Sequence, residues 1–174
     1  MNWQIPNNVS FEDALNLSET LLEAMESQQL KDDEIQEMIT TLVNSENGAR
    51  GFFVTYLTSD HSLADNPSSE VINGLKTCPE IVSELLVKNL AMSSAMAITH
   101  RRNNDEKTAQ GSDRVCQRTT QIIQQLNLEL VTEKLKKLKS TIIHGKGIYA
   151  SFLEKWGYDE EQKKVIQNNL ENLI

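Results

Sequence analysis

The sequence has few of the residues that form disulfides, redox motifs or cysteine-rich metal sites. Its 174 residues include only two cysteines. Cys78 and Cys116 lie 38 residues apart and form no Cys-x-x-Cys pair, which excludes a zinc knuckle and a thioredoxin-like motif. We therefore expect two reduced, partly buried cysteines that pack as small apolar residues.

Proline and glycine are also scarce, with three and seven residues. Such a chain is neither collagen-like nor a proline- and glycine-rich disordered linker. Hydrophobic residues make up 39% of the chain and charged residues 24%. This balance favours a folded helical protein over a disordered one.

Long apolar runs are missing as well. Even the most apolar stretch, residues 77–102, carries Glu80, Glu84 and Lys88, whereas a membrane span needs about 18 to 20 apolar residues. The first six residues have neither the positive charge nor the apolar run of a secretory signal. We expect a soluble cytoplasmic protein.

Residues 77–102 nevertheless form the strongest structural signal. Thr77 and Glu80 have the spacing of a capping box, which predicts the start of a helix. The large apolar residues recur at steps of three and four, so the helix is apolar on most of its circumference and must be surrounded. They are Ile81, Val82, Leu85, Leu86, Leu90, Met92, Met96 and Ala97.

The rest of the chain also follows helical spacing, with no convincing period of two. We predict one all-α domain over residues 1–174, a bundle of six to eight helices around a central buried helix. Ser10 and Asp159 are expected to cap helices, and residues 103–113 to form a polar loop or a frayed extension. Residues 1–9 read as an extended arm whose Trp3, Ile5 and Val9 can reach the body. The expected aromatic core consists of Phe52, Phe53, Tyr56, Phe152 and Trp156.

Charge is distributed unevenly along the chain. The net charge is −8, but residues 1–75 contain 13 acidic and two basic residues, a net −11. Residues 76–174 contain 15 basic and 12 acidic residues, a net +3. Two interpretations are open: acidic and basic faces lie near each other within one fold, or the basic part receives an anionic partner.

Basic residues are densest between Arg101 and Gly147, where ten face five acidic residues. A solvated face, a docking surface for an acidic protein and a nucleic-acid site are all consistent with such a region. The aromatic residues lie outside it, which disfavours nucleic acid. The candidate interaction surface consists of Arg101, Arg102, Arg114, Arg118, Lys134, Lys136, Lys137, Lys139 and Lys146.

Catalytic and cofactor motifs give no positive signal. Residues 145–150 match a Gly-x-Gly-x-x-Ala pattern, but the 24 residues that follow read as helix rather than as a parallel sheet, so we predict a glycine break between helices. The three histidines are far apart in sequence: His61, His100 and His144. No metal or cofactor is predicted.

The leading hypothesis is therefore a soluble helical protein that binds another protein, or a second copy through an exposed apolar helix face, without catalysis. One alternative is a metal-binding or enzymatic bundle in which His100 joins carboxylates of other helices. A further alternative is nucleic-acid binding through residues 101–147. The sequence leaves enzymatic activity open.

Overall fold

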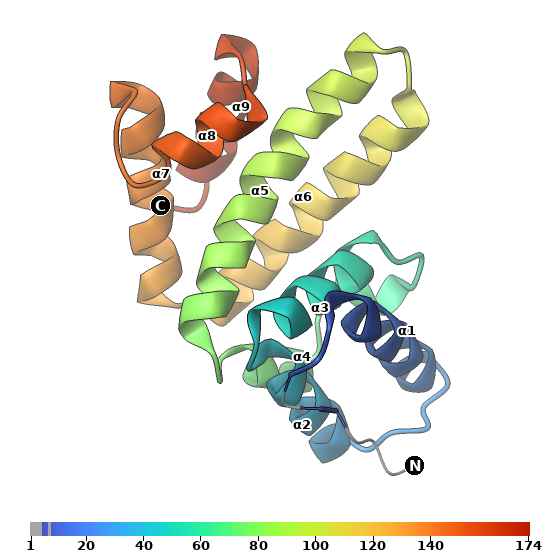
Figure 1. Cartoon of the computed structure of the whole chain (residues 1–174). Helices are drawn as coiled ribbons and strands as arrows, with labels where there is room; N and C mark the ends of the chain where they lie inside the picture. Colours follow the sequence, from blue (N-terminus) through green and yellow to red (C-terminus); the bar gives the residue numbers. More distant parts are fainter. Residues whose placement is uncertain (1–4, 7) are drawn as a thin grey trace. The chain divides into compact units, whose positions relative to one another are not determined.

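The protein is all-helical in the computed structural model, which describes residues 5, 6 and 8 to 174 (Figure 1). This part of the chain has nine α-helices, one 3-10 helix and no strand. The all-α prediction is confirmed, with one helix more than the expected maximum. The helices are α1 (Phe11–Glu26), α2 (Asp32–Val43), α3 (Glu46–Thr58), η1 (Ser62–Asp65), α4 (Ser69–Leu75), α5 (Pro79–Arg102), α6 (Glu106–Leu126), α7 (Glu129–His144), α8 (Ala150–Trp156) and α9 (Glu160–Glu171).

The chain divides into two compact units, Met1–Leu85 and Leu86–Ile174, here called unit 1 and unit 2. The boundary falls inside α5. Unit 1 holds α1 to α4 and the first turns of α5, and unit 2 holds the rest of α5 together with α6 to α9. That the whole chain is a single domain stays a prediction.

The arm predicted at the N-terminus is non-helical where the structure describes it. Val9 is buried and Ile5 is half-buried, so both contribute apolar surface to the body of unit 1. Trp3 lies outside the described residues.

The core of unit 1 is built around α3. Its rings of Phe52 and Tyr56 stack with centroids 5.2 Å apart, and Phe53 meets Phe52 edge-on at 5.6 Å. All three side chains are buried, as predicted. On another face of α3, Gly51 lies directly against Ala14 of α1, because a Cβ at Gly51 would be 2.4 Å from the Ala14 Cβ.

The second part of α5 is the centre of unit 2. It contacts α6 where Ser94 Oγ lies 3.5 Å from Cys116 Sγ, and α8 where the Lys88 ammonium lies 5.8 Å from the centre of the Phe152 ring. It contacts α9 where Gln162 donates to the Ala95 carbonyl at 3.2 Å. These three neighbours explain why Leu90, Ala91, Ala95 and Ala97 are buried. Met92 and Met96 of the same helix are half-buried.

The predicted start of this helix is wrong by two residues. The helix begins at Pro79, and the Val82 amide donates to the Cys78 carbonyl at 3.1 Å. The Thr77 hydroxyl instead donates backwards to the Gly74 carbonyl at 2.6 Å. Thr77 therefore closes the end of α4 and lies outside α5.

Helix α5 is also more apolar than we expected from the charged residues Glu80, Glu84 and Lys88 within it. By length and composition alone it could cross a membrane, although 56% of its apolar window is buried within the structure. The core helix of a soluble protein has the same property, and burial on this scale is consistent with that.

The expected loop at residues 103–113 is largely helical. Helix α6 begins at Glu106, where the Asp105 carboxylate accepts from the Thr108 amide at 3.1 Å. Arg101 then bridges Glu106 at 3.1 Å and Asp113 at 2.6 Å. A capping carboxylate and two ion pairs, made by acids two turns apart, support the first turns of α6. These turns have no apolar stripe, which is why apolar periodicity did not predict them.

Trp156 is not a core residue, contrary to the prediction. Its side chain is 47% exposed at the last position of α8, and the Lys155 ammonium lies 5.5 Å from its ring centre. Phe152 is half-buried. Helix α8 has only seven residues and buries only Leu153 fully, so its helical spacing places the other large side chains partly in solvent.

The close approach of Gly51 to α1 predicts that Gly51→Ala destabilises the protein, by about 1–3 kcal/mol, because an added methyl group overpacks the contact with Ala14. The matched control is Gly111→Ala in α6, where no atom lies within 4 Å of the added carbon. That change should stabilise the protein by about 0.5–1 kcal/mol through helix propensity. Urea unfolding followed by circular dichroism measures both, and equal effects of the two substitutions would refute the packing argument.

Candidate functional site

A hollow of about 410 Å³ in unit 2 is the candidate site. It lies among the C-terminal end of α7, helix α8 and the start of α9, three helices drawn next to one another in orange and red in Figure 1. Its volume is within the usual range of ligand pockets, about 300–1,000 Å³. The lining residues are Thr141, Ile142, Gly145, Ala150, Leu153, Glu154, Gly157, Tyr158 and Lys163.

Two glycines turn the chain at the edges of this hollow. Gly145 ends α7 with a φ of 67°, and Gly157 ends α8 with a φ of 62°. Their amides donate to the Thr141 carbonyl at 2.9 Å and the Leu153 carbonyl at 3.1 Å. Both are left-handed C-caps, a conformation that favours glycine. The predicted glycine break between α7 and α8 is confirmed.

The polar groups of the hollow are a hydroxyl, a phenol, an ammonium group and the carboxylate of Glu154. The Thr141 hydroxyl already donates to the Lys137 carbonyl at 2.8 Å. Burial raises the pKa of Tyr158 to about 12, so its phenol stays protonated at neutral pH. Lys163 lies 3.5 Å from Glu160. An apolar lining with a few fixed polar groups is typical of recognition sites.

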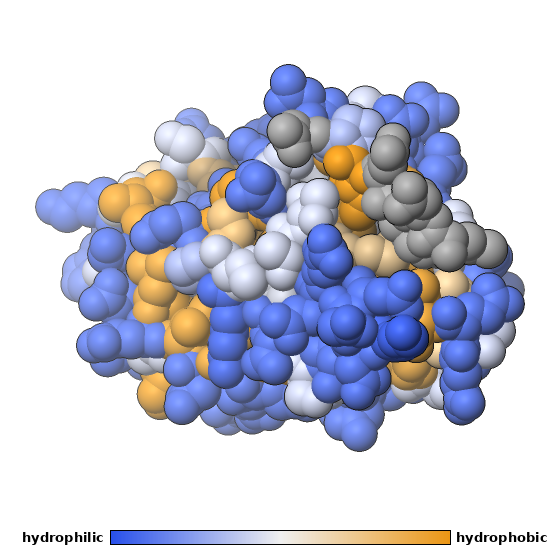
Figure 2. All heavy atoms as spheres, turned by 90° about the horizontal axis from the view of Figure 1, so that it is seen from below, coloured by the Kyte–Doolittle hydropathy of each residue, from blue (hydrophilic) through white to orange (hydrophobic). Residues whose placement is uncertain are grey.

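Large exposed apolar side chains gather on the segment that carries the hollow. Ile143, Ile148 and Trp156 are 53%, 66% and 47% exposed. In the described part of the chain only Val54 and Ile174 are comparable. Figure 2 shows one face of the molecule, on which apolar patches are separated by polar side chains. Three such residues within 14 positions therefore stand out from the rest of the surface.

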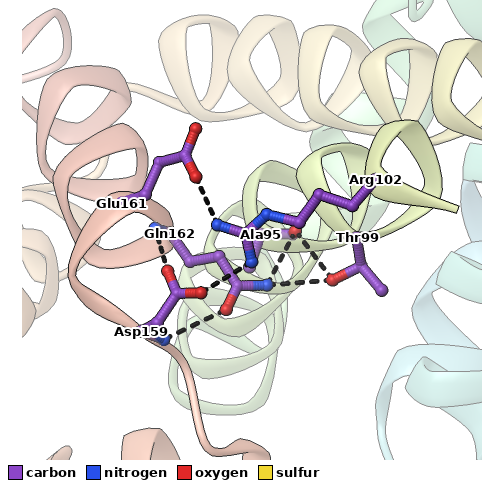
Figure 3. A network of polar contacts seen from close by, with 6 residues as sticks. All are labelled: Ala95, Thr99, Arg102, Asp159, Glu161 and Gln162. Atoms are coloured by element: carbon purple, nitrogen blue, oxygen red, sulfur yellow. Dashed lines mark hydrogen bonds and ion pairs between the residues drawn. The ribbon is translucent and has the colours of Figure 1, made fainter.

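Gln162 holds α9 in place through both ends of its amide (Figure 3). The side-chain oxygen of Gln162 accepts from the backbone amide of Asp159 at 3.1 Å. In return, the Asp159 carboxylate accepts from the backbone amide of Gln162 at 2.9 Å. Its nitrogen donates to the Ala95 carbonyl at 3.2 Å and to the Thr99 hydroxyl at 2.9 Å. The predicted cap at Asp159 is confirmed. The Gln162 anchor was missed, although the Asp-x-x-Gln spacing of a capping box was visible.

Arg102 joins the same network from the end of α5 (Figure 3). It donates to Asp159 at 2.6 Å and also to Glu161. The guanidinium lowers the pKa of the Asp159 carboxyl, and the backbone amide of Gln162 lowers it further. Two carboxylates at the start of α9 thus share one guanidinium of unit 2.

Asn169 fixes α9 two turns further along. Its side chain donates to Ser94 Oγ at 2.8 Å and lies 3.6 Å from Cys116 Sγ. Both cysteines of the chain are free and half-buried, as predicted.

The nine basic residues predicted as an interaction surface differ in burial and in ion pairing. Arg101, Arg102 and Lys139 form ion pairs with carboxylates of unit 2. Arg118 is 2% exposed. Arg114 and Lys134 are half-buried, and Lys136, Lys137 and Lys146 are exposed, as are the ion-paired Arg101 and Arg102.

The three histidines are held in separate places. His61 Nδ1 lies 2.6 Å from Glu26, and His144 Nδ1 lies 2.8 Å from the Ser140 carbonyl. His100 is half-buried near the end of α5. Among residues that the structure describes, no three His, Cys, Asp or Glu side chains are grouped so as to hold a metal ion.

The anchoring role of Gln162 predicts that Gln162→Ala lowers the free energy of unfolding by about 1–3 kcal/mol, because buried donors and acceptors lose their partner. Gln167→Ala in the same helix is the control, since Gln167 bonds only to Glu171 on an exposed face. That change should remain within about 0.5 kcal/mol. Urea unfolding measures both, and a Gln162→Ala protein as stable as the control would contradict the role.

The lowered pKa of Asp159 predicts a pH dependence. A carboxyl with a depressed folded-state pKa stabilises the fold above its ordinary value of 3.8, and this contribution is lost as pH falls through the folded-state value. Asp159→Asn keeps the capping oxygen but removes the charge. Its stability deficit should be constant above about pH 5 and shrink below the ordinary value. Urea titrations from neutral to acid pH test this, with Glu154→Gln as control. A stability deficit that grows as the pH falls would contradict this prediction.

A protein-family match covers nearly the whole chain. No curated protein and no solved structure matches the chain. A family described as "Uncharacterised conserved protein UCP020893" matches residues 10–173. This range covers all nine α-helices of the described chain, with the network of Figure 3 and the hollow. The chain belongs to this family.

Proposed function

We propose that the protein works by binding another protein, through the hollow in unit 2 and the apolar residues beside it. The observation that carries the proposal is the combination of an apolar-lined hollow with Ile143, Ile148 and Trp156 exposed on the same segment. Apolar side chains exposed together mark interaction sites far more often than scattered ones. A soluble, cytoplasmic location forms part of the same proposal.

The shape of the hollow supports a protein partner. It is bounded by the end of α7, the short helix α8, the start of α9 and two glycine caps, so backbone hydrogen bonds hold its walls. Such a surface is already formed before binding, which reduces the entropy that association must overcome. Trp156, which directly precedes the lining residue Gly157 in the chain, is of the residue type most enriched among the residues that dominate binding energy.

Site-specific crosslinking with mass spectrometry tests the proposal. The tagged wild-type chain is compared with a double variant, Ile148→Asp with Trp156→Asp, in extract of the native cells. Both residues are exposed, so the substitutions leave the core intact. In the double variant, the yield of the specific crosslinked partners is expected to fall by at least about tenfold. This corresponds to a loss of roughly 1.4 kcal/mol of binding free energy.

The matched control is Val54→Asp, which places the same charge on an equally exposed apolar residue of unit 1. Val54 and Trp156 are both 47% exposed. The control should keep all partners. If the double variant keeps the same partners at the same yield, the proposal is wrong. It is also wrong if the control loses the partners to the same extent, because the binding is then nonspecific hydrophobic association.

A further inference from the structure

We propose that the hollow receives an acidic, amphipathic segment of a different protein. In this arrangement apolar side chains of the segment enter the hollow and its carboxylates meet the lysines around it. The inference rests on the proposed function and adds the chemistry of the partner. It is argued from the charges left over around the hollow and from the surfaces that the chain itself offers.

The segment that carries the hollow has an excess of positive charge. Residues 134–164 contain eight lysines and four acidic residues. Three of the acids are already engaged, because Arg102 binds Asp159 and Glu161 and Lys163 lies beside Glu160. Within the described chain, Glu154 is the acid of this segment without an ion pair. The exposed lysines are Lys136, Lys137, Lys146, Lys155 and Lys164.

These lysines lie close to the lining along the chain. Lys146, Lys155 and Lys164 each follow a lining residue directly. Lys137 is one helical turn before the lining residue Thr141. The Thr141 hydroxyl donates to the Lys137 carbonyl at 2.8 Å. From this closeness along the chain we infer that an anionic partner seated on the hollow meets several ammonium groups. Rim charges of this kind steer association and choose between partners.

A second copy of the chain satisfies only half of this requirement. Unit 1 is strongly acidic, with 15 acidic and three basic residues. In its described part, however, Val54 is the one large apolar residue that counts as exposed. Symmetric pairing of the two hollows would supply apolar surface but place lysines against lysines. A separate segment that carries both carboxylates and apolar anchors meets both conditions.

Nucleic acid meets the conditions less well. Phosphates would find the lysines, but the lining residues Ile142, Ala150 and Leu153 offer nothing to a charged backbone. Bases could stack on Trp156, yet its ring is already partly covered by Lys155. An amphipathic helix laid in an apolar groove uses both the lining and the rim.

Fluorescence anisotropy with designed peptides tests the partner class. The probe is a labelled helix of about five turns with leucine at i, i+3, i+4 and i+7 and glutamate on its flanks. Its twins replace every glutamate by lysine, or every leucine by glutamine. The acidic amphipathic probe is expected to bind the full-length wild-type chain at least about tenfold more tightly than either twin.

Two charge-reversal variants make the test specific. Lys137→Glu with Lys146→Glu should weaken binding of the acidic probe by about tenfold and strengthen binding of the lysine twin. The matched control is Lys76→Glu with Lys107→Glu, which makes the same change in net charge at exposed lysines outside the segment. The control should change the affinity by less than about threefold.

The inference is overturned if the acidic probe fails to bind, if it binds no more tightly than its twins, or if both charge reversals act equally. A labelled single-stranded oligonucleotide that displaces the probe and binds more tightly would assign the lysines to phosphates instead. Self-association that competes with the probe, measured by sedimentation, would assign the hollow to a second copy. Each of these results can occur while the crosslinking experiment still supports a protein-binding hollow, so the two proposals fail separately.

Discussion

The amide of Gln162 is the contact on which the arrangement of unit 2 depends. A buried amide without partners destabilises a fold by about 1–3 kcal/mol, and Gln162 is only 7% exposed. Both of its ends are satisfied, one by the cap of its own helix and the other by Ala95 and Thr99 of α5. Because Ala95 is small, the backbone carbonyl of α5 remains within reach of another helix. The network in Figure 3 therefore fixes where α9 begins.

The position of the hollow follows from this contact. Tyr158 and Lys163, which line it, are the immediate neighbours of Asp159 and Gln162, which anchor α9. The opposite walls come from α7 and α8, whose ends are fixed by left-handed glycines. Residues that anchor α9 and residues that line the hollow thus lie next to one another in the chain. The short helix α8 is too small to cover its own apolar residues, which leaves Trp156 in solvent.

The positive charge available on the surface is also smaller than the number of basic residues indicates. Much of the positive charge between residues 101 and 147 is used inside unit 2, since Arg101, Arg102 and Lys139 bind carboxylates. Exposed ion pairs of this kind add little stability each, but they remove charge that a partner would otherwise meet. The exposed lysines Lys136, Lys137 and Lys146 lie further along the chain, in the segment that carries the hollow. The anionic-partner hypothesis therefore moves from the whole basic region to its second half.

The sequence by itself determined the all-helical class, the long apolar helix α5, the aromatic core of α3 and the caps at Ser10 and Asp159. These features follow from spacing and from local hydrogen bonds, which a linear pattern contains. It did not determine the helical start of α6 or the exposure of Trp156, because the first depends on ion pairs with Arg101 and the second on what covers α8. Only the tertiary structure decided that Gln162 is an anchor and that the ends of α7, α8 and α9 enclose a hollow. Contacts between residues more than 60 positions apart, such as Gln162 with Ala95, leave no periodic signal in the chain.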